Sequence, residues 1–313
     1  MKDIAGQTDK KIKSQVTGKI DKLKKEKNAL ILAHFYQQPE VQDIADFTGD
    51  SLGLSRKAAA TAADVIVFCG VRFMAETAAI LSPRKRVIMP APESGCPMAD
   101  MITAEELRAL KAKHPRAVVV CYVNTTAEVK AESDICCTSA NAVKVVKSVP
   151  ADKEIIFVPD RCLGDYAARK SGRKFINWQG YCSSHIGISE TDIKARRQEH
   201  PEAKVVAHPE CRPEVIQLAD KVASTSGMLK YAAQEEAAEF IVATEIGMLY
   251  PLRKQNPNKK FFAASNKAFC YNMKLINLNS VLYSLENIQY EIKVPDEIRG
   301  KAVSSIERML KIS

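Results

Sequence analysis

Three cysteines recur at nearly equal intervals along the chain and could together hold a metal cluster. Cys96, Cys182 and Cys270 are separated by 86 and 88 residues. Such spacing is typical of a triplicated domain rather than of a solenoid, whose repeats are roughly 20–50 residues long. We therefore expect one cysteine at the same place in each of three units. Three thiolates could bind an iron–sulfur cube and leave one iron without a protein ligand.

Two further sets of side chains follow the same spacing of 88 and 86 residues. They are the ring set His34, Tyr122 and His208, and the hydroxyl set Ser51, Ser139 and Thr225. A hydroxyl group at a helix N-terminus can bind an anion together with the backbone N–H groups there. Each member of the hydroxyl set is expected to open a helix, although any one alone could be an ordinary N-cap. Three such helix starts around one cavity predict substrates with several carboxylate or phosphate groups.

Groups that can move protons are expected where the first strand of each unit ends. The sequences at these places are His34-Phe-Tyr36, Tyr122-Val-Asn124 and His208-Pro-Glu210. Histidine titrates near neutrality, and burial or a nearby metal can tune carboxylates and phenols. The structural alternative for each of these rings is a satisfied hydrogen bond under a loop.

The apolar pattern predicts an α/β fold with three short parallel sheets. Each unit has four apolar runs that alternate with helical patterns, which is typical of parallel strands covered on both faces. A (β/α)₈ barrel would not explain a threefold repeat with about four strands per unit. The predicted strands are 29–33, 46–47, 65–69 and 87–89, then 118–122, 135–137, 155–158 and 175–178, then 205–207, 222–223, 240–243 and 261–263.

These elements predict three similar αβα domains related by pseudo-three-fold symmetry around a central active site. Ligands of open parallel sheets gather beyond the carboxyl ends of the strands, so the residues named above should line one cavity. The predicted domains are 29–115, 116–202 and 203–294, with an amphipathic lead helix at 1–28 and a C-terminal helix at 295–313.

Two pairs of residues predict equivalent helices in the first two units. Thr103 with Glu106, and Ser189 with Asp192, have the spacing of capping boxes and lie 86 residues apart. The helices that they open should end at two His-Pro sequences, where a histidine is usually structural. We therefore assign no catalytic role to the histidines there, His114 and His200.

Composition and charge favour a cytoplasmic protein that binds neither membranes nor nucleic acids. The net charge is +9, but the lysine-rich residues 1–27 supply five of these charges. The basic segment has no aromatic or motif support for nucleic-acid binding. The apolar run at 117–123 is far shorter than the roughly 20 residues of a membrane span. The first residues lack a secretory signal pattern.

The remaining cysteines give no sign of a disulfide framework, because nine is an odd number and the chain looks cytoplasmic. Zinc usually takes paired ligands from short loops, a pattern that the three repeat cysteines lack. The other six have no counterpart at the repeat spacing and are expected to be small buried residues: Cys69, Cys121, Cys136, Cys137, Cys162 and Cys211.

Together the residues predict a cluster-dependent enzyme that condenses or dehydrates small anionic molecules. No dinucleotide fingerprint or Walker loop is present, which disfavours hydride transfer and nucleotide hydrolysis. Two alternatives are another iron–sulfur hydro-lyase acting on a hydroxy acid, and a cluster-based redox or iron sensor.

The chain resembles the quinolinate synthase family of bacterial and archaeal NAD biosynthesis over nearly its full length. The segments that carry the resemblance are Ala33-His-Phe-Tyr-Gln-Gln38, Gly49-Asp-Ser51, Gly95-Cys-Pro-Met-Ala-Asp-Met101, Tyr122-Val-Asn-Thr125, Gly180-Tyr-Cys-Ser-Ser-His185, His208-Pro-Glu-Cys211, Ser224-Thr-Ser-Gly-Met228 and Cys270 before Asn-Met-Lys-Leu275.

The resemblance implies a [4Fe–4S] cluster on Cys96, Cys182 and Cys270, with its open iron as a Lewis acid. It implies the condensation of iminoaspartate with dihydroxyacetone phosphate to quinolinate, phosphate and two waters. It also suggests that an L-aspartate-oxidising enzyme hands over the unstable imine. The implied catalytic residues are His34, Tyr36 and Glu210, and the implied substrate-binding residues are His34, Ser51, Tyr122, Val123, Asn124, Ser139, His208, Pro209, Glu210 and Thr225.

Overall fold

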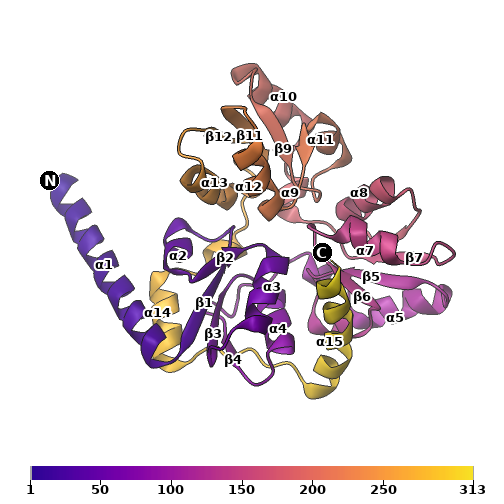
Figure 1. Ribbon diagram of the computed structural model, residues 1–313, viewed down its shortest axis with the longest axis horizontal. Helices are drawn as coiled ribbons and strands as arrows, with labels where there is room; N and C mark the ends of the chain where they lie inside the picture. The colour runs from indigo at the N-terminus through magenta and orange to yellow at the C-terminus, as the bar shows by residue number, and fades with distance from the viewer. Residues whose placement is uncertain (1, 313) are drawn as a thin grey trace.

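The computed structural model describes residues 2–312, with side chains from residue 12 onward, and contains three separate four-stranded sheets (Figure 1). Every neighbouring pair of strands in the three sheets is parallel. The strand orders are β2-β1-β3-β4, β6-β5-β7-β8 and β10-β9-β11-β12, so one order recurs three times. The predicted fold class, three αβα units with short parallel sheets, is confirmed.

The strands lie where the apolar runs predict them, with ends that differ by at most two residues. The first sheet contains β1 (Ala29–His34), β2 (Phe47–Gly49), β3 (Val65–Cys69) and β4 (Arg86–Ile88). The second contains β5 (Val118–Tyr122), β6 (Ile135–Cys137), β7 (Ile155–Val158) and β8 (Ile176–Asn177). The third contains β9 (Lys204–Ala207), β10 (Lys221–Val222), β11 (Glu239–Ala243) and β12 (Lys260–Ala263).

Helices connect these strands in the right order for parallel pairing. The chain begins with α1 (Lys2–Glu26). Around the first sheet follow α2 (Pro39–Ile44), α3 (Ser51–Ala60), α4 (Arg72–Leu81), the 3₁₀ turn η1 (Ala99–Met101) and α5 (Ala104–Lys113). The second repeat has α6 (Ala127–Ala131), α7 (Ala142–Ser148), α8 (Arg161–Ser171), α9 (Ser183–Ile186) and α10 (Glu190–Glu199). The rest are α11 (Pro213–Leu218), α12 (Thr225–Gln234), η2 (Ile246–Met248), α13 (Leu249–Gln255), η3 (Asn272–Lys274), α14 (Leu278–Asn287) and α15 (Asp296–Lys311).

One side-chain contact recurs in all three units and fixes the same local geometry. In each unit an aspartate between the first helix and the second strand accepts a backbone N–H of the first strand. Because aspartate carboxylates are strong acceptors, this contact joins the loop before the edge strand to the centre of each sheet. The contacts are Ile31 N to Asp46 Oδ2 (2.8 Å), Val119 N to Asp134 Oδ2 (2.8 Å) and Val205 N to Asp220 Oδ2 (2.7 Å).

The helix that follows the fourth strand of each unit covers the next unit along the chain. Helix α5 contacts α6 of the second unit, and α10 contacts α11 and β11 of the third. Helix α14 returns to the first unit, where it packs beside α1 and contacts β3 (Figure 1). The three units are therefore linked in a ring, each supplying a helix to its neighbour.

The two predicted capping boxes are present, and both helices end at the expected histidines. Thr103 accepts from the backbone N–H of Glu106, and Ser189 accepts from that of Asp192, each with the reciprocal contact. The C-cap residues are His114 and His200.

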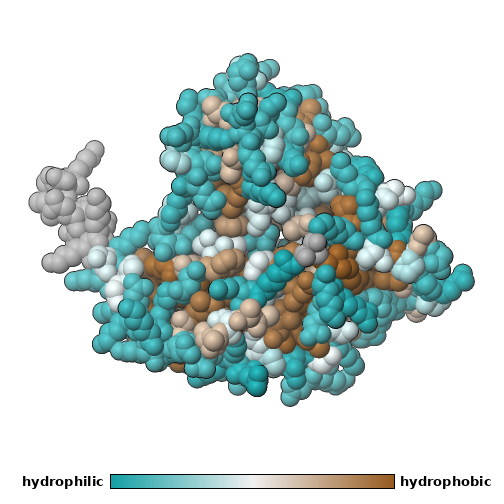
Figure 2. Space-filling model, viewed as in Figure 1, coloured by the Kyte–Doolittle hydropathy of each residue, from teal (hydrophilic) through white to brown (hydrophobic). Residues whose placement is uncertain are grey.

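The terminal helices pack against the outside of the units. In α1 the predicted apolar stripe is only partly buried: Ile20 is fully buried, Val16 and Leu23 pack beside it, and Ile12 is 54% exposed. Helix α15 packs against α6, β6 and α4. Hydrophilic side chains cover most of the face seen in Figure 2, and apolar ones show mainly toward its middle. Within residues 2–312, every helix is too short or too polar to cross a bilayer.

Candidate active site

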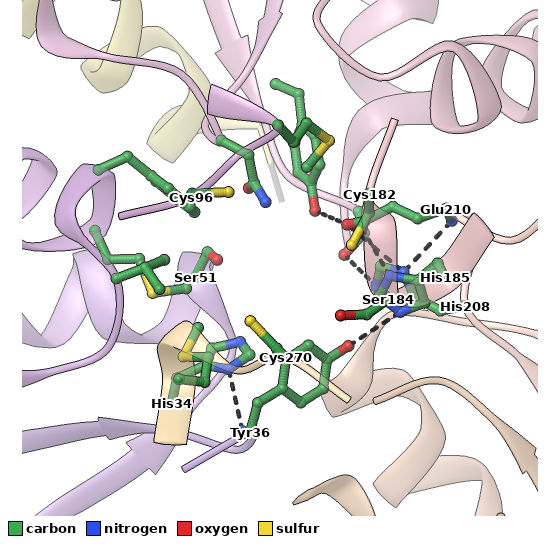
Figure 3. Close-up of a pocket in the computed structure, with 18 of the residues that line it drawn as sticks. His34, Tyr36, Ser51, Cys96, Cys182, Ser184, His185, His208, Glu210 and Cys270 are labelled. Atoms are coloured by element: carbon green, nitrogen blue, oxygen red, sulfur yellow. Dashed lines mark hydrogen bonds and ion pairs between the residues drawn. The ribbon is translucent and has the colours of Figure 1, made fainter. Parts of the chain in front are cut away.

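One cavity lies among the three units, and side chains from all three units line it (Figure 3). Twelve of the fourteen residues predicted for the site line this cavity: His34, Tyr36, Ser51, Cys96, Tyr122, Asn124, Ser139, Cys182, His208, Glu210, Thr225 and Cys270.

Two predicted binding residues do not line the cavity. Val123 is buried and gives its backbone N–H to the Cys137 carbonyl, which continues the pairing of β5 with β6. Pro209 lies on the outer side of its loop, where it lines a different hollow. Both were expected from the family resemblance, and both are neighbours of residues that do face the cavity.

The three repeat cysteines each stand just before a short helical turn and reach the cavity from different units (Figure 3). Burial is the main influence on their thiols and raises each pKa, to about 12 for Cys96. Backbone N–H groups two or three residues further on act in the opposite direction. Such groups favour thiolate and are the contacts that tune cluster sulfurs, so the donor set fits a thiolate-bound cluster.

A second set of atoms in the cavity could hold a single metal ion. Cys182, His185 and Glu210 each offer a ligand atom, and these atoms lie within 4.8 Å of one another. Both oxygens of Glu210 already have partners, however: Oε1 accepts from Tyr122, and Oε2 lies 2.9 Å from His185 Nδ1. A single ion here would break the pair between His185 and Glu210 and leave two of the repeat cysteines unused.

A chain of buried polar groups connects Tyr36 with Glu210. The Tyr36 hydroxyl lies 2.6 Å from Thr244 Oγ1, which lies 2.8 Å from His185 Nε2. His185 Nδ1 lies 2.9 Å from Glu210 Oε2, although within the described residues it has no partner in hydrogen-bonding alignment. These contacts and the hydrogen bond from Tyr122 converge on Glu210.

Opposing influences act on the ionisable groups of this chain. Burial acts to raise the pKa of Glu210, but the adjacent His185 imidazole and the hydrogen bond from Tyr122 act in the opposite direction and hold it below the ordinary glutamate value. Burial and then the charge of Glu210 raise the pKa of both Tyr36 and Tyr122 far above that of a free phenol. Glu210 is thus a carboxylate between two protonated phenols.

His34 and His208 share one local geometry that fixes their tautomers. The backbone N–H of Tyr36 donates to Nδ1 of His34 (3.1 Å), and that of Glu210 donates to Nδ1 of His208 (3.4 Å). Burial is the largest cause that lowers the pKa of each imidazole to about 3. Both rings are therefore neutral near pH 7, with the proton on Nε2, which makes them hydrogen-bond donors rather than bases.

Two of the three predicted hydroxyls open helices, and the third does not. Ser51 and Thr225 are the first residues of α3 and α12, while Asp50 and Ser224 serve as the N-caps. The Ser51 and Thr225 hydroxyls form no hydrogen bond with any side chain or backbone group in the described part of the chain. They are thus available to a ligand.

The prediction that Ser139 opens a helix is wrong, because α7 begins three residues later and has Asn141 as its N-cap residue. The Asn141 side chain accepts from the backbone N–H of Thr138, which folds residues 138–141 into a turn ahead of the helix. Ser139 still faces the cavity, where its Oγ lies 3.1 Å from His208 Nε2.

Asn124 presents a buried oxygen to the same space. Its Oδ1 is inaccessible to solvent and finds no hydrogen-bond donor among the residues that the structure describes. A buried carbonyl without a partner is costly, so a ligand that donates to it would be favoured.

Sequence reasoning missed His185 and Thr244. Neither has a counterpart at the repeat spacing, since the positions three residues after Cys96 and Cys270 hold Ala99 and Met273. The available signal was local: His185 follows Cys182 by three residues, which places both at one side of a short helix such as α9.

A buried ion pair behind Cys270 was also missed. Glu245 is fully buried and accepts the backbone N–H of Cys270 at 3.1 Å. The Lys274 ammonium lies 2.9 Å from Glu245 Oε1. Because this pair ties together the loops on both sides of Cys270, it fixes the place of that thiol.

Comparison with known proteins gives matches over almost the whole chain. The sequence profile described as quinolinate synthetase A protein matches residues 18–311. The chain is 58% identical over 297 residues to a protein of Dehalococcoides mccartyi strain CBDB1 named quinolinate synthase, covering 95% of this chain and 98% of that one. It is 55% identical to the quinolinate synthase of Desulforudis audaxviator, in a match that covers 96% of this chain and 99% of that one. It is 54% identical to quinolinate synthase 2 of Methanosarcina acetivorans, in a match that covers 95% of this chain and 96% of that one.

Proposed function

Because the chain belongs to the quinolinate synthetase A family, we propose that it condenses iminoaspartate with dihydroxyacetone phosphate to quinolinate, phosphate and two waters, a step of NAD biosynthesis. The observation that carries the proposal is the convergence of Cys96, Cys182 and Cys270, one from each unit, on a cavity that also holds proton-moving groups. The three thiols would hold a [4Fe–4S] cluster. When bound, such a cluster supplies a Lewis-acidic iron that can polarise a carboxylate or hydroxyl of the reacting molecule.

The substrates' negative charges would be held by hydrogen-bond donors around the cavity. Ser51 and Thr225 present unused hydroxyls at the N-termini of ten-residue helices, where backbone N–H groups favour anions. His34 and His208 add neutral Nε2–H donors. Asn124 adds an acceptor for a substrate N–H or O–H. The cavity thus offers several separate donor positions, as two dianionic substrates require.

Proton transfer would run through Glu210. A proton taken up by the Tyr36 oxygen would pass through Thr244 to His185 Nε2, and from His185 Nδ1 to Oε2 of Glu210, which lies 2.9 Å away. Glu210, which also accepts from the Tyr122 hydroxyl, is the carboxylate at the end of this path. This arrangement suits the tautomerisations and losses of water that form an aromatic ring, which require a base and an acid near one another.

A hydro-lyase acting on a hydroxy acid remains the enzymatic alternative, and a cluster-based sensor the non-enzymatic one. The hydro-lyase would turn over a single substrate without any phosphate donor. A sensor would have no use for a buried chain of acid, imidazole and phenol groups ending in a cavity.

The deciding experiment is anaerobic reconstitution with iron and sulfide, followed by assay with both substrates. We expect about four irons and four sulfides per chain, as a cube requires, and formation of quinolinate with release of phosphate. One iron or zinc without sulfide would instead support the single-ion site at Cys182, His185 and Glu210. A cluster-loaded protein that forms no quinolinate from the pair would contradict the proposal.

The chemistry of the imine also suggests a partner. Iminoaspartate hydrolyses in water, so an L-aspartate-oxidising enzyme that releases it close to the cavity would improve its capture. We expect both enzymes to work in the cytoplasm.

A further inference from the structure

A groove runs along the outside of the candidate active site, between the second and third units. One wall is formed by Lys144 and Lys147 of α7 and by Tyr166 and Lys170 of α8. The other wall belongs to the third unit, from Pro209 to the start of α12. We call this hollow the basic groove. It continues between α8 and α11, past Arg169 and Lys221.

The basic groove and the central cavity lie on opposite sides of the same three loops. Thr138 faces the cavity and Ala140 the groove, while Ser139 lines both. His208 and Glu210 face the cavity, but Pro209 between them faces the groove. In the third loop Thr225 faces the cavity, and its neighbour Ser224 lines the groove.

A single hydrogen bond spans the seam between the two spaces. The Nε2 atom of His208, from the third unit, lies 3.1 Å from Oγ of Ser139, from the second. Because Ser139 lines both spaces, this contact lies where the cavity and the groove are adjacent.

The groove is strongly basic, and its lysines are unpaired. It is lined by five cations against one carboxylate, Asp220, which already pairs with Arg197 at 3.1 Å. Lys144, Lys147 and Lys170 are exposed and have no carboxylate within 4 Å in the part of the chain whose side chains are described. Unpaired cations along a concave surface produce a positive potential that concentrates small anions.

We propose that the basic groove is the route by which the phosphate-bearing substrate reaches the cavity, with Lys144, Lys147 and Lys170 attracting the dianion to the seam at His208 and Ser139. The inference rests on the proposed function, which supplies a doubly charged substrate. Lysine ammonium groups are well suited to this task, because they bind phosphate as mobile point charges without fixed geometry. The lysines raise the rate at which the substrate is captured and do not take part in the reaction itself.

The test is steady-state kinetics of the reconstituted enzyme and of the triple variant Lys144→Ala/Lys147→Ala/Lys170→Ala. The varied substrate is dihydroxyacetone phosphate, with the imine saturating. We expect kcat/KM to fall about tenfold at about 20 mM ionic strength, while kcat and iron content stay unchanged. The difference in kcat/KM between the variant and wild type should shrink as the ionic strength rises to about 300 mM, where the Debye length is about 6 Å.

Two controls separate a local effect from net charge. The triple variant Lys57→Ala/Lys113→Ala/Lys293→Ala removes the same charge from exposed lysines on α3, at the end of α5 and before α15, and should behave as wild type. The variant Lys144→Arg/Lys147→Arg/Lys170→Arg keeps the positive charges and should retain most of kcat/KM. Equal kcat/KM in the groove variant and wild type, or an equal loss in the control variant, would overturn the proposed route. A wild-type enzyme that makes no quinolinate would instead refute the function on which it rests.

Discussion

His185 and Glu210 form a buried pair, with Nδ1 and Oε2 2.9 Å apart, although the two residues come from different repeats of the chain. His185 lies on the short helix that starts at the second repeat cysteine, and Glu210 follows the first strand of the third unit. The pair therefore forms only when the second and third units meet. It links the position of a proposed cluster ligand to the protonation of the proposed base.

Substitution of Cys96, Cys182 or Cys270 by alanine should abolish the cluster. Each is the one cysteine that its repeat contributes to the cavity. Iron and sulfide content and the visible spectrum after anaerobic reconstitution measure the effect. As controls, Cys69→Ala and Cys136→Ala should keep the full content, because these thiols are buried in sheet interiors. Full iron and sulfide in any of the first three variants would refute the ligand set.

Glu210→Gln should keep the cluster but lower kcat by roughly 10²–10⁴, the usual contribution of a positioned base. Glutamine preserves the size of the side chain and can still contact Tyr122 and His185, but it cannot take up a proton. Single-turnover formation of quinolinate by the reconstituted variant measures the loss. A rate within a factor of about three of wild type would leave Glu210 with only a binding role.

His185→Gln should lower kcat by roughly 10²-fold and shift the acidic limb of the pH–rate profile upward. His185 is one of the groups that hold the pKa of Glu210 low, so its removal should raise that pKa. The profile of kcat against pH, with iron content as a check, distinguishes this role from a purely structural one. His114→Gln, at a helix end outside the cavity, is the matched control and should leave the profile unchanged.

The free energy of unfolding of the cluster-free protein should fall as the pH falls from about 6.5 toward about 3. Burial lowers the pKa of His34 and His208 from 6.5 to about 3 in the folded state. In this window the unfolded chain binds a proton at each ring that the folded chain does not. Stability is therefore lost on acidification, by up to about 1.4 kcal/mol per pH unit for each histidine.

Anaerobic urea titrations at about pH 7.5 and about pH 5 measure this loss. His34→Gln should reduce the pH dependence of the unfolding free energy. His200→Gln, at a helix end, should leave that pH dependence unchanged. Glu210 acts in the same direction at lower pH, because its folded pKa is also depressed. An unfolding free energy that stays constant between the two pH values would show that the imidazoles are protonated in the folded protein.

A product-like dicarboxylate should change the visible spectrum of the reconstituted cluster and compete with substrate. The prediction follows from three protein thiols for four irons, which leaves one iron open to a carboxylate. Ser51→Ala or Thr225→Ala should weaken the analogue by about 1–3 kcal/mol, because each removes a donor to a charged group. An inhibitory analogue that leaves the spectrum unchanged would favour a fourth protein ligand.

The sequence predicted the scaffold well because apolar runs and capping residues act locally. Strand β5 and the capping box at Thr103 have the bounds that their sequence patterns predict. The prediction for Ser139 was only partly correct. The repeat spacing predicted its position in the cavity, but the turn closed by Asn141 makes the helix begin after it. His185 was missed for the opposite reason. Site residues were sought at positions that recur in all three units, and His185 occurs in one unit only. Its contacts with Thr244 and Glu210 arise between units, which no local pattern records.

The exchange of helices among the three units bears on how such a chain could have arisen. Helix α5 lies on the second unit, α10 on the third and α14 on the first, so each copy covers a surface that is not its own. A single ancestral copy would expose that helix, which in the present chain contacts a neighbouring unit. Three identical copies in a closed ring would satisfy every such surface and bring one cysteine from each to the axis. The arrangement is thus what fusion of a homotrimeric ancestor into one polypeptide would leave behind.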